Sequence, residues 1–281
     1  MDVPSELIGS AKNDDAKSRI AAIHKDIWID CPISREPLDA VINILDVPIR
    51  TTAPCILVYG EGGSGKTTIV KQLQKRNQKL GTPYVFLTLV ENLSNLKLKS
   101  LILDAMGLPT RISSGKDTLP KEIGHYLRTK GIKAIIIDEF NEALLVPKNE
   151  QLKNLSLFKG LSGDPYNLSV IAFGTKLARN ALQYDEQLAR RYYFHELTPW
   201  SLDGDFRNFL ATLEKAVGLK KSSGIHQEEM LRLIHKLSDG VMNNVVNLVR
   251  FSAIYAITSG EERITKELIE FVAKKPWGYK A

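Results

Sequence analysis

Residues 60–67 read Gly60-Glu61-Gly62-Gly63-Ser64-Gly65-Lys66-Thr67, which is a complete G-x-x-x-x-G-K-[ST] pattern. An apolar, β-prone stretch, Cys55–Tyr59, precedes this loop, and a helical pattern that begins at Thr68 follows it. Strand, glycine-rich turn and helix start are the context that a phosphate-binding loop requires. The glycines allow main-chain N–H groups to converge on phosphate oxygens, and the positive end of the helix adds to that field. The sequence therefore predicts a binding site for a nucleoside triphosphate, formed by residues 60–68.

Within this loop, two side chains have the chemistry to act on the phosphates directly. Lys66 is expected to reach the β- and γ-phosphates, and the Thr67 hydroxyl is expected to bind Mg²⁺.

Two carboxylates follow a predicted buried strand. Asp138 and Glu139 come directly after the apolar residues Ala134–Ile137. Because ligands in open parallel sheets bind at the carboxyl ends of the strands, both side chains should lie beside the phosphate loop. We expect Asp138 to hold Mg²⁺ through water and Glu139 to act as the base that orients the attacking water. The alternative is a solvated turn at the end of the strand.

Three further residues are candidates for the reaction. Thr175 follows the predicted strand Ser169–Phe173 and could contact the γ-phosphate or the water. Arg190 and Arg191 precede another predicted strand, and phosphoryl transfer gains from an arginine that neutralises charge on the γ-phosphoryl group. If copies of the chain assemble, one of the two arginines would serve a neighbour's site; otherwise they are a surface pair.

Strand and helix patterns alternate through the middle of the chain and then give way to helices alone. Predicted strands cover residues 55–59, 84–89, 134–137, 169–173 and 192–197, and helical patterns after Pro199 cover residues 203–217, 227–237, 244–258 and 265–274. The predicted fold is α/β, a P-loop αβα parallel sheet followed by a small all-helical lid domain. The expected domains are a helical lead-in over 1–49, a core over 50–198, and a lid with the C-terminal tail over 199–281.

Two segments at the ends of the chain are less regular. In the lead-in, helices are expected over residues 16–27 and 38–45, with a break over 30–37 that contains two prolines. The tail Lys274–Tyr279 is either a docking peptide with exposed aromatic anchors or an end tucked onto the lid.

The composition of the 281 residues is that of an ordinary globular protein. No apolar run approaches the ~20 residues that a membrane-spanning helix needs, and the first residues lack a signal pattern. The two cysteines are too few for a disulfide framework. The default expectation is a cytoplasmic protein.

The net charge of +6 is unevenly distributed. Between residues 71 and 133 there are twelve Lys and Arg residues against four Asp and Glu residues. Such an excess attracts polyanions, although a set of solvated helix faces would give the same count.

Together these motifs resemble the AAA+ ATPases, and more narrowly the TniB/TnsC-type ATPases of transposons, which include the short TnsC proteins of CRISPR-associated transposons. The narrower resemblance rests on Trp28–Pro32, Asp185–Arg191 and Leu237–Gly240, and the likeness extends over about residues 20–275. It implies a bacterial, nucleoid-associated protein that binds ATP with Mg²⁺, oligomerises on double-stranded DNA as a ring or helical filament, and links a target-selector protein to the transposase. The DNA contacts implied by the resemblance are Lys97, Lys99, Arg111, Ser113, Ser114 and Lys116.

The chain departs from the AAA+ pattern in the lid. Many members carry an arginine three residues after a glycine equivalent to Gly240, where this chain has Asn243. Slow, switch-like hydrolysis is the expectation that follows. Ile33 and Arg35 are the candidates for the base pocket.

Two other functions fit the same motifs. A helicase loader or origin-recognition-like ATPase that remodels a protein partner would usually carry a winged helix after the lid, whereas this sequence ends at Ala281. A signalling ATPase would normally need appended domains. The expectation is therefore a regulator of transposition.

Overall fold

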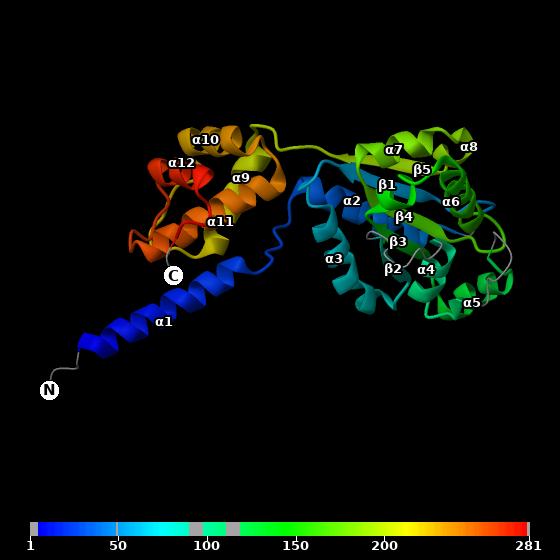
Figure 1. The fold of residues 1–281 in the computed structure, drawn as a ribbon, viewed down its shortest axis with the longest axis horizontal. Helices are drawn as coiled ribbons and strands as arrows, with labels where there is room; N and C mark the ends of the chain where they lie inside the picture. The colour runs from blue at the N-terminus through cyan, green and yellow to red at the C-terminus, as the bar shows by residue number, and fades with distance from the viewer. Residues whose placement is uncertain (1–4, 49, 90–97, 111–118, 280–281) are drawn as a thin grey trace. The chain divides into compact units, whose positions relative to one another are not determined.

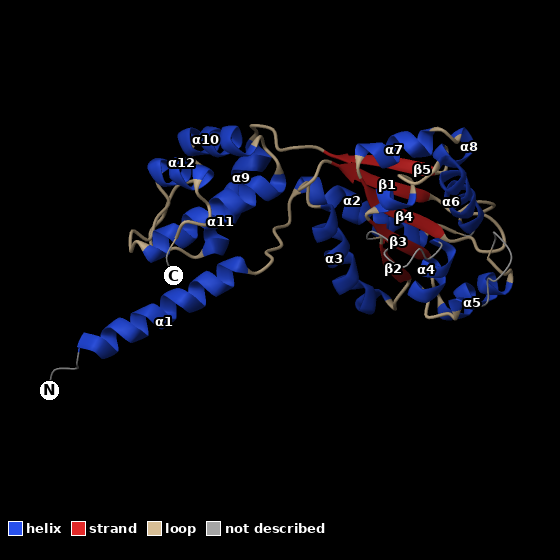
Figure 2. Cartoon of the chain, viewed as in Figure 1, coloured by secondary structure: helices blue, strands red, loops and turns tan. Residues whose placement is uncertain are grey.

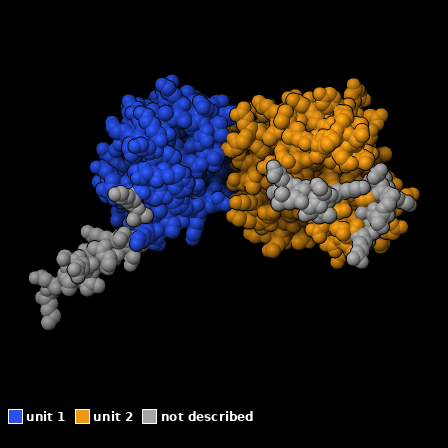
Figure 3. Space-filling view, in the orientation of Figure 1, with its two compact units in different colours: residues 1–32, 199–281 blue, residues 33–198 orange. Residues whose placement is uncertain are grey.

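A computed structural model describes residues 5–48, 50–89, 98–110 and 119–279, with side chains from residue 15 onward. The chain divides into two compact units, residues 33–198 and residues 1–32 with 199–281 (Figure 3). The N-terminal stretch is thus shared between the two, since residues 33–49 belong to the first unit. Among the described residues, no helix is both long and apolar enough to cross a bilayer.

The first unit, which we call the sheet unit, is built on a five-stranded parallel sheet with the order β2-β3-β4-β1-β5 (Figures 1 and 2). All five predicted strands are confirmed, with ends that differ by at most one residue. They are β1 (Cys55–Gly60), β2 (Tyr84–Thr88), β3 (Ala134–Asp138), β4 (Ser169–Gly174) and β5 (Tyr192–Leu197). Since all pairs are parallel, the carboxyl ends of the strands share one edge of the sheet.

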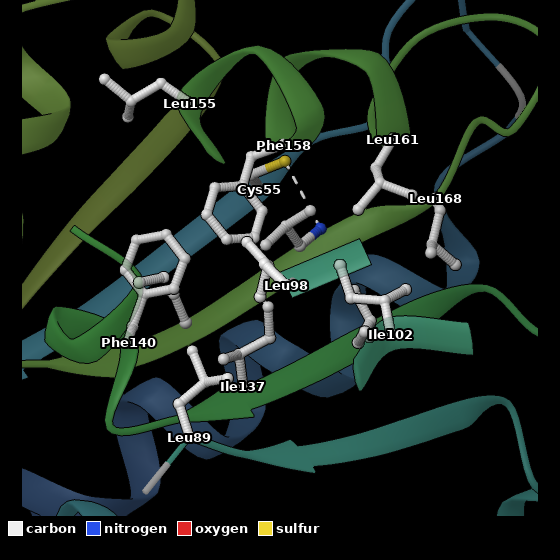
Figure 4. Packing of buried hydrophobic residues seen from close by; sticks show 14 of the residues in the cluster. Cys55, Leu89, Leu98, Ile102, Ile137, Phe140, Leu155, Phe158, Leu161 and Leu168 are labelled. Carbon is white, nitrogen blue, oxygen red and sulfur yellow. Dashed lines mark hydrogen bonds between the residues drawn. The ribbon is translucent and has the colours of Figure 1, made fainter. Parts of the chain in front are cut away.

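One face of the sheet carries the larger core of the unit (Figure 4). Alternate strand residues such as Leu57 and Ile137 contribute to it, as period-2 geometry requires. The rings of Phe140 and Phe158 pack with centroids 4.7 Å apart and are fully buried. The helices of this layer are α4 (Leu98–Ala105), α5 (Glu122–Lys130), η4 (Phe140–Ala143), α6 (Lys148–Leu161), α7 (Lys176–Gln183) and α8 (Glu186–Ala189).

Helices α7 and α8 were not predicted from the sequence. The buried residues of α7 are Ala178, Ala181 and Leu182, and the helix has only 8 residues, fewer than the roughly 11–18 over which a helical period is recognised in a sequence. Helix α8 is a single turn, in which the Asp185 carboxylate accepts a hydrogen bond from the main-chain N–H of Leu188.

Helices α2 (Pro32–Asn43) and α3 (Lys66–Asn77) belong to the same unit, with short helices η1 (Ile44–Asp46) and η2 (Gln78–Leu80) after them. The expected break over residues 30–37 is confirmed only at residues 30 and 31 and is wrong over 32–37, because α2 begins at Pro32 and contains Pro37. A proline in the first turn loses no hydrogen bond, and the burial of Pro37 and Leu38 offsets the bond lost inside the helix. The phenolic O–H of Tyr84 on β2 donates to the Val41 carbonyl of α2 across 3.2 Å.

The second unit, which we call the helical unit, contains helices alone among its described residues (Figure 2). Its N-terminal helix packs on α11, with Ile20 and Ile23 buried, and the Arg19 guanidinium makes a bidentate pair with Glu262 at 2.7 and 2.8 Å. The helices are α1 (Ser5–His24), α9 (Gly204–Val217), α10 (Glu228–Ser238), α11 (Met242–Thr258) and α12 (Lys266–Lys274).

The C-terminal tail packs on the helical unit, which is the second of the two arrangements expected from the sequence. The Tyr255 hydroxyl donates to the Lys275 carbonyl across 2.8 Å, and the Tyr279 hydroxyl lies 3.0 Å from His24 Nε2. The Trp277 ring is parallel to the His24 ring and meets Phe251 edge-on, with centroids 6.0 and 4.6 Å away.

Candidate nucleotide-binding site

The loop after β1 has the backbone geometry that its glycines predict. Gly63 and Gly65 have φ angles of +80° and +96°, in the left-handed region that strains other residues. A Cβ added to Gly60 would lie 2.8 Å from the Leu197 carbonyl oxygen. Helix α3 begins at Lys66, so the N–H groups of its first turn face the loop.

The Lys66 side chain is buried inside this loop, with 8 % of the residue exposed. Its ammonium donates to the main-chain oxygens of Glu61 and Gly60 at 2.8 and 3.0 Å and to Ser64 Oγ at 3.3 Å. Burial lowers the pKa of Lys66, whereas the charges of Glu139 and Asp138 act in the opposite direction. The cation and the two carboxylates are therefore within electrostatic reach of one another.

The acidic pair lies at the end of β3, as predicted. The Asp138 side chain is buried, and its Oδ1 accepts a hydrogen bond from the Glu139 N–H at 3.0 Å. Glu139 has a φ of +53°, which is unusual for a residue with a side chain. Such strain in a residue at a candidate site points to a functional constraint on its backbone.

Two buried oxygen atoms beside this pair have no hydrogen-bond partner among the described residues, Thr175 Oγ1 and Asn141 Oδ1. The end of β4 packs on the turn after β3, because a Cβ on Gly174 would lie 3.6 Å from the Asn141 nitrogen. A buried polar atom without a partner costs about 1–3 kcal/mol, so both oxygens are suited to a group from outside the chain. Sequence reasoning identified Thr175 and missed Asn141, for which the only signal is a position two residues after Glu139.

These residues fit a triphosphate with a divalent cation. The loop offers main-chain N–H groups and the Lys66 cation to phosphate oxygens. The Asp138 carboxylate and the Thr67 hydroxyl are oxygen ligands of the kind that Mg²⁺ prefers. Thr67 and Thr68 are exposed in the first turn of α3, where an incoming phosphate can reach them.

The two candidate arginines have different environments. Arg191 Nη1 donates to the Lys159 carbonyl at 2.7 Å and to Ser162 Oγ at 2.8 Å, which ties it to the end of α6. The Arg190 side chain is 81 % exposed, with a Glu186 carboxylate 3.7 Å away.

A polar network that the sequence analysis did not predict lies beside the loop. The Tyr59 hydroxyl donates to the Glu196 carboxylate at 3.1 Å, and the Lys176 ammonium lies 3.1 Å from the same group. The Arg179 guanidinium lies over the Tyr59 ring, 5.3 Å from its centroid. Because Tyr59 immediately precedes Gly60, this network fixes the residue from which the loop departs.

Comparisons with known proteins identify the family and the fold of the chain. The family model described as bacterial TniB protein matches residues 19–202, about two thirds of the chain. The chain belongs to the TniB family. No curated protein matches it.

Solved structures similar to this TniB-family chain share its fold. The ORC1 protein of Aeropyrum pernix, solved in complex with DNA, has a TM-score of 0.59 and 16% identity, covering 91% of this chain and 68% of that one. Cdc6p from Pyrobaculum aerophilum has a TM-score of 0.62 and 14% identity, covering 93% and 72%. The RuvB Holliday junction branch migration motor of Thermotoga maritima has a TM-score of 0.52 and 14% identity, covering 86% of this chain and 67% of that one. The fold is that of an AAA+ ATPase, as the sequence predicted.

The remaining predicted residues of this TniB-family chain are only partly described. Lys99 is half-buried in α4, and the other predicted DNA contacts, Lys97, Arg111, Ser113, Ser114 and Lys116, lie outside the described residues. Ile33 is half-buried and Arg35 exposed in the first turns of α2. Asn243 is exposed in the first turn of α11.

Proposed function

We propose that this chain is an ATP-dependent regulator of transposition that oligomerises on double-stranded DNA and links a target-selector protein to the transposase. The observation that carries the proposal is the convergence of Lys66, Asp138 and Glu139 at the phosphate loop of a TniB-family chain. The proposed reaction is hydrolysis of ATP to ADP and phosphate.

Each residue of the site has a distinct task in this proposal. Lys66 and the loop N–H groups hold the phosphates, and Thr67 with Asp138 holds Mg²⁺, which supplies charge neutralisation at the phosphate oxygens. Glu139 orients the attacking water and accepts its proton. The Thr175 hydroxyl, which has no partner among the described residues, accepts a hydrogen bond from that water or donates one to a γ-phosphate oxygen.

A neighbouring copy is proposed to complete the site. Arg190 is the candidate for the arginine supplied in trans, because its side chain projects from the surface while Arg191 is held by the carbonyl of Lys159 and the hydroxyl of Ser162. An arginine that reaches the γ-phosphoryl group makes hydrolysis depend on assembly. With Asn243 at the lid position, we propose that hydrolysis by the unassembled chain is slow.

DNA binding is proposed to involve phosphate contacts without sequence preference. Its support is the basic excess between residues 71 and 133 and the likeness of fold to ORC1, which was solved in complex with DNA. Lysine and arginine contacts to phosphates release counterions, so binding should weaken steeply with salt.

The test is electron microscopy of the protein with linear duplex DNA, Mg²⁺ and a non-hydrolysable ATP analogue. We expect continuous assemblies on the DNA that are missing when nucleotide is omitted or when Lys66→Ala replaces the wild-type chain. Isolated single copies on the DNA at saturating analogue would overturn the proposal. A second arm measures whether the purified cognate transposase inserts DNA faster in the presence of the chain.

A further inference from the structure

Two groups that are proposed to act on the γ-phosphate come from different strands of the sheet unit. The phosphate loop with Lys66 follows β1, and Thr175 follows β4 as the N-cap residue of α7. The Thr175 hydroxyl oxygen is buried and has no hydrogen-bond partner among the described residues, so its own contacts do not fix it. Since both groups serve one phosphoryl group, contacts between other residues have to hold the distance between them.

A single carboxylate connects the residues that adjoin these two groups. Glu196 on β5 accepts a hydrogen bond from the Tyr59 hydroxyl through Oε2 at 3.1 Å, and its Oε1 lies 3.1 Å from the Lys176 ammonium. Tyr59 immediately precedes Gly60, the first residue of the loop, and Lys176 immediately follows Thr175. The carboxylate therefore joins the start of the loop to the start of α7.

Further contacts support this connection. Helix α7 packs against β1 (Figure 1), and the Arg179 guanidinium lies over the buried Tyr59 ring, 5.3 Å from its centroid. The hydrogen bond and the charge of Glu196 raise the pKa of Lys176, and the charge of Glu61 in the loop acts in the same direction. Lys176 is thus a cation within electrostatic reach of the loop.

The contribution of this network to stability should be small. The side chains of Lys176 and Glu196 are 56 % and 35 % exposed, and an ion pair so accessible to water contributes little to folding. Its position between two groups of the site has a larger consequence, because a displacement of about 1 Å in a catalytic group can lower a rate about 10²-fold.

We infer that Glu196 is a positioning residue for ATP hydrolysis. One oxygen of its carboxylate holds Lys176 and the other holds Tyr59, and together these contacts set the distance between the Thr175 hydroxyl and the phosphate loop. A carboxylate suits this task because it has two acceptor oxygens, whereas an amide has one. The inference rests on the proposed function, since it needs hydrolysis of ATP at this loop.

The test uses the full chain with Glu196→Gln and, separately, Lys176→Met. The amide cannot accept hydrogen bonds from Tyr59 and Lys176 through two oxygens, so one of the two contacts is lost. The control is Glu229→Gln, which removes the carboxylate of an exposed pair with Lys266 at 2.7 Å in the helical unit.

Three measurements are made on each variant. Phosphate release with Mg²⁺ and duplex DNA gives kcat and KM for ATP. Fluorescent analogues of ATP and ADP give the two nucleotide Kd values, and urea unfolding gives the stability.

We expect kcat to fall at least about tenfold in both variants, while the Kd of the ADP analogue stays within about twofold of the wild-type value. ADP has no γ-phosphate and does not depend on the position of Thr175. The two substitutions remove opposite charges, so a direct effect of charge on the nucleotide would change the two rates in opposite directions. Loss of positioning lowers both, and Glu229→Gln should keep the wild-type kcat.

A second comparison separates positioning from loss of structure. If Glu196 acts through the Thr175 hydroxyl, Glu196→Gln should lower kcat much less in a Thr175→Val chain than in the wild-type chain. Equal factors in the two backgrounds would overturn the inference. A purely structural role would lower the urea midpoint and weaken binding of both analogues alike, and that result would overturn it too.

The inference and the proposed function can fail separately. Wild-type kcat in both variants, or changes of opposite sign, would overturn the inference and leave the proposed function standing. A wild-type chain that does not hydrolyse ATP would overturn the proposed function, and the inference with it.

Discussion

The ammonium nitrogen of Lys66 lies 2.8 Å from the main-chain oxygen of Glu61, five residues earlier in the same loop. The chain therefore holds its cation within the phosphate loop by its own backbone. Desolvation of this ammonium is unfavourable and lowers its pKa, so a bound anion would relieve a cost that the free protein bears. The loop is thus prepared for a polyanion before any ligand arrives.

Glu139→Gln should separate binding from turnover. The amide keeps the size of the side chain but cannot accept the proton of the attacking water, so the hydrolysis rate should fall by about 10²–10⁴-fold. The Kd of a fluorescent ATP analogue should stay within about twofold of the wild-type value. Phosphate release is the measurement, with the exposed Glu150→Gln as control. Unchanged hydrolysis in Glu139→Gln would remove Glu139 from the base role.

Arg190→Ala and Arg191→Ala should affect different properties of the protein, the first its rate of ATP hydrolysis and the second its stability. Loss of the exposed Arg190 side chain should lower hydrolysis in the assembled state by roughly 10³-fold or more, with unchanged stability. Loss of Arg191 leaves the buried Ser162 hydroxyl and the Lys159 carbonyl without that donor, so the free energy of unfolding should fall by about 1–3 kcal/mol. Chemical denaturation and steady-state hydrolysis of both variants distinguish the two roles. The assignment is contradicted if Arg191→Ala keeps full stability and Arg190→Ala keeps full activity.

Gly240→Ala should destabilise the helical unit more than Gly218→Ala. Both glycines have positive φ angles, +67° and +64°, so both substitutions carry a backbone cost of about 1–2 kcal/mol. Only at Gly240 would the new Cβ also lie 2.6 Å from the Trp200 carbonyl oxygen, which raises the expected cost to about 2–4 kcal/mol. Urea unfolding compares the two variants directly. If both variants lost the same free energy of unfolding, the close approach to the Trp200 carbonyl would add no cost, and the expectation would be contradicted.

The pair between Arg19 and Glu262 should make the helical unit sensitive to acid. Hydrogen bonds from Arg19 hold the pKa of Glu262 below its ordinary value. A carboxylate with a lowered folded-state pKa contributes stability above its unfolded pKa of about 4.3, and this contribution is lost as pH falls through the folded-state value. Glu262→Gln should therefore lower stability at pH 7 by about 1–3 kcal/mol and flatten the loss of stability below pH 5.

Urea midpoints between pH 7 and pH 3 test this expectation. Glu261→Gln, at the neighbouring exposed position, is the control and should retain the wild-type pH dependence. If the urea midpoint fell equally steeply with decreasing pH in the wild-type chain and in Glu262→Gln, the pair of Arg19 and Glu262 would not contribute to the stability.

The features that the sequence predicted are local. Strands β1, β3 and β4 are runs of mostly apolar residues buried on both faces. The phosphate loop is specified by eight consecutive residues. Asp138 and Glu139 could be placed beside that loop because parallel strands end at a common edge, a rule that needs no knowledge of strand order.

Several of the features that were missed depend on contacts between distant parts of the chain. Tyr59 and Glu196 are 137 residues apart and meet because β5 pairs with β1. Arg19 and Glu262, 243 residues apart, meet because α1 packs on α11. In each pair, no sequence pattern around one residue identifies the other. The different environments of the adjacent Arg190 and Arg191 likewise follow from the packing of α6.

The central claim is that the loop around Lys66 binds ATP with Mg²⁺, and isothermal titration calorimetry tests it most directly. The account predicts a saturable heat for ATP with Mg²⁺ at one site per chain. In Lys66→Ala it predicts an affinity at least about tenfold weaker, since charge-assisted hydrogen bonds contribute roughly 1.5–3 kcal/mol. The exposed Lys75→Ala on the same helix should bind as the wild-type chain does. A wild-type titration without binding heat, confirmed by the absence of ATP-induced thermal stabilisation, would contradict the account.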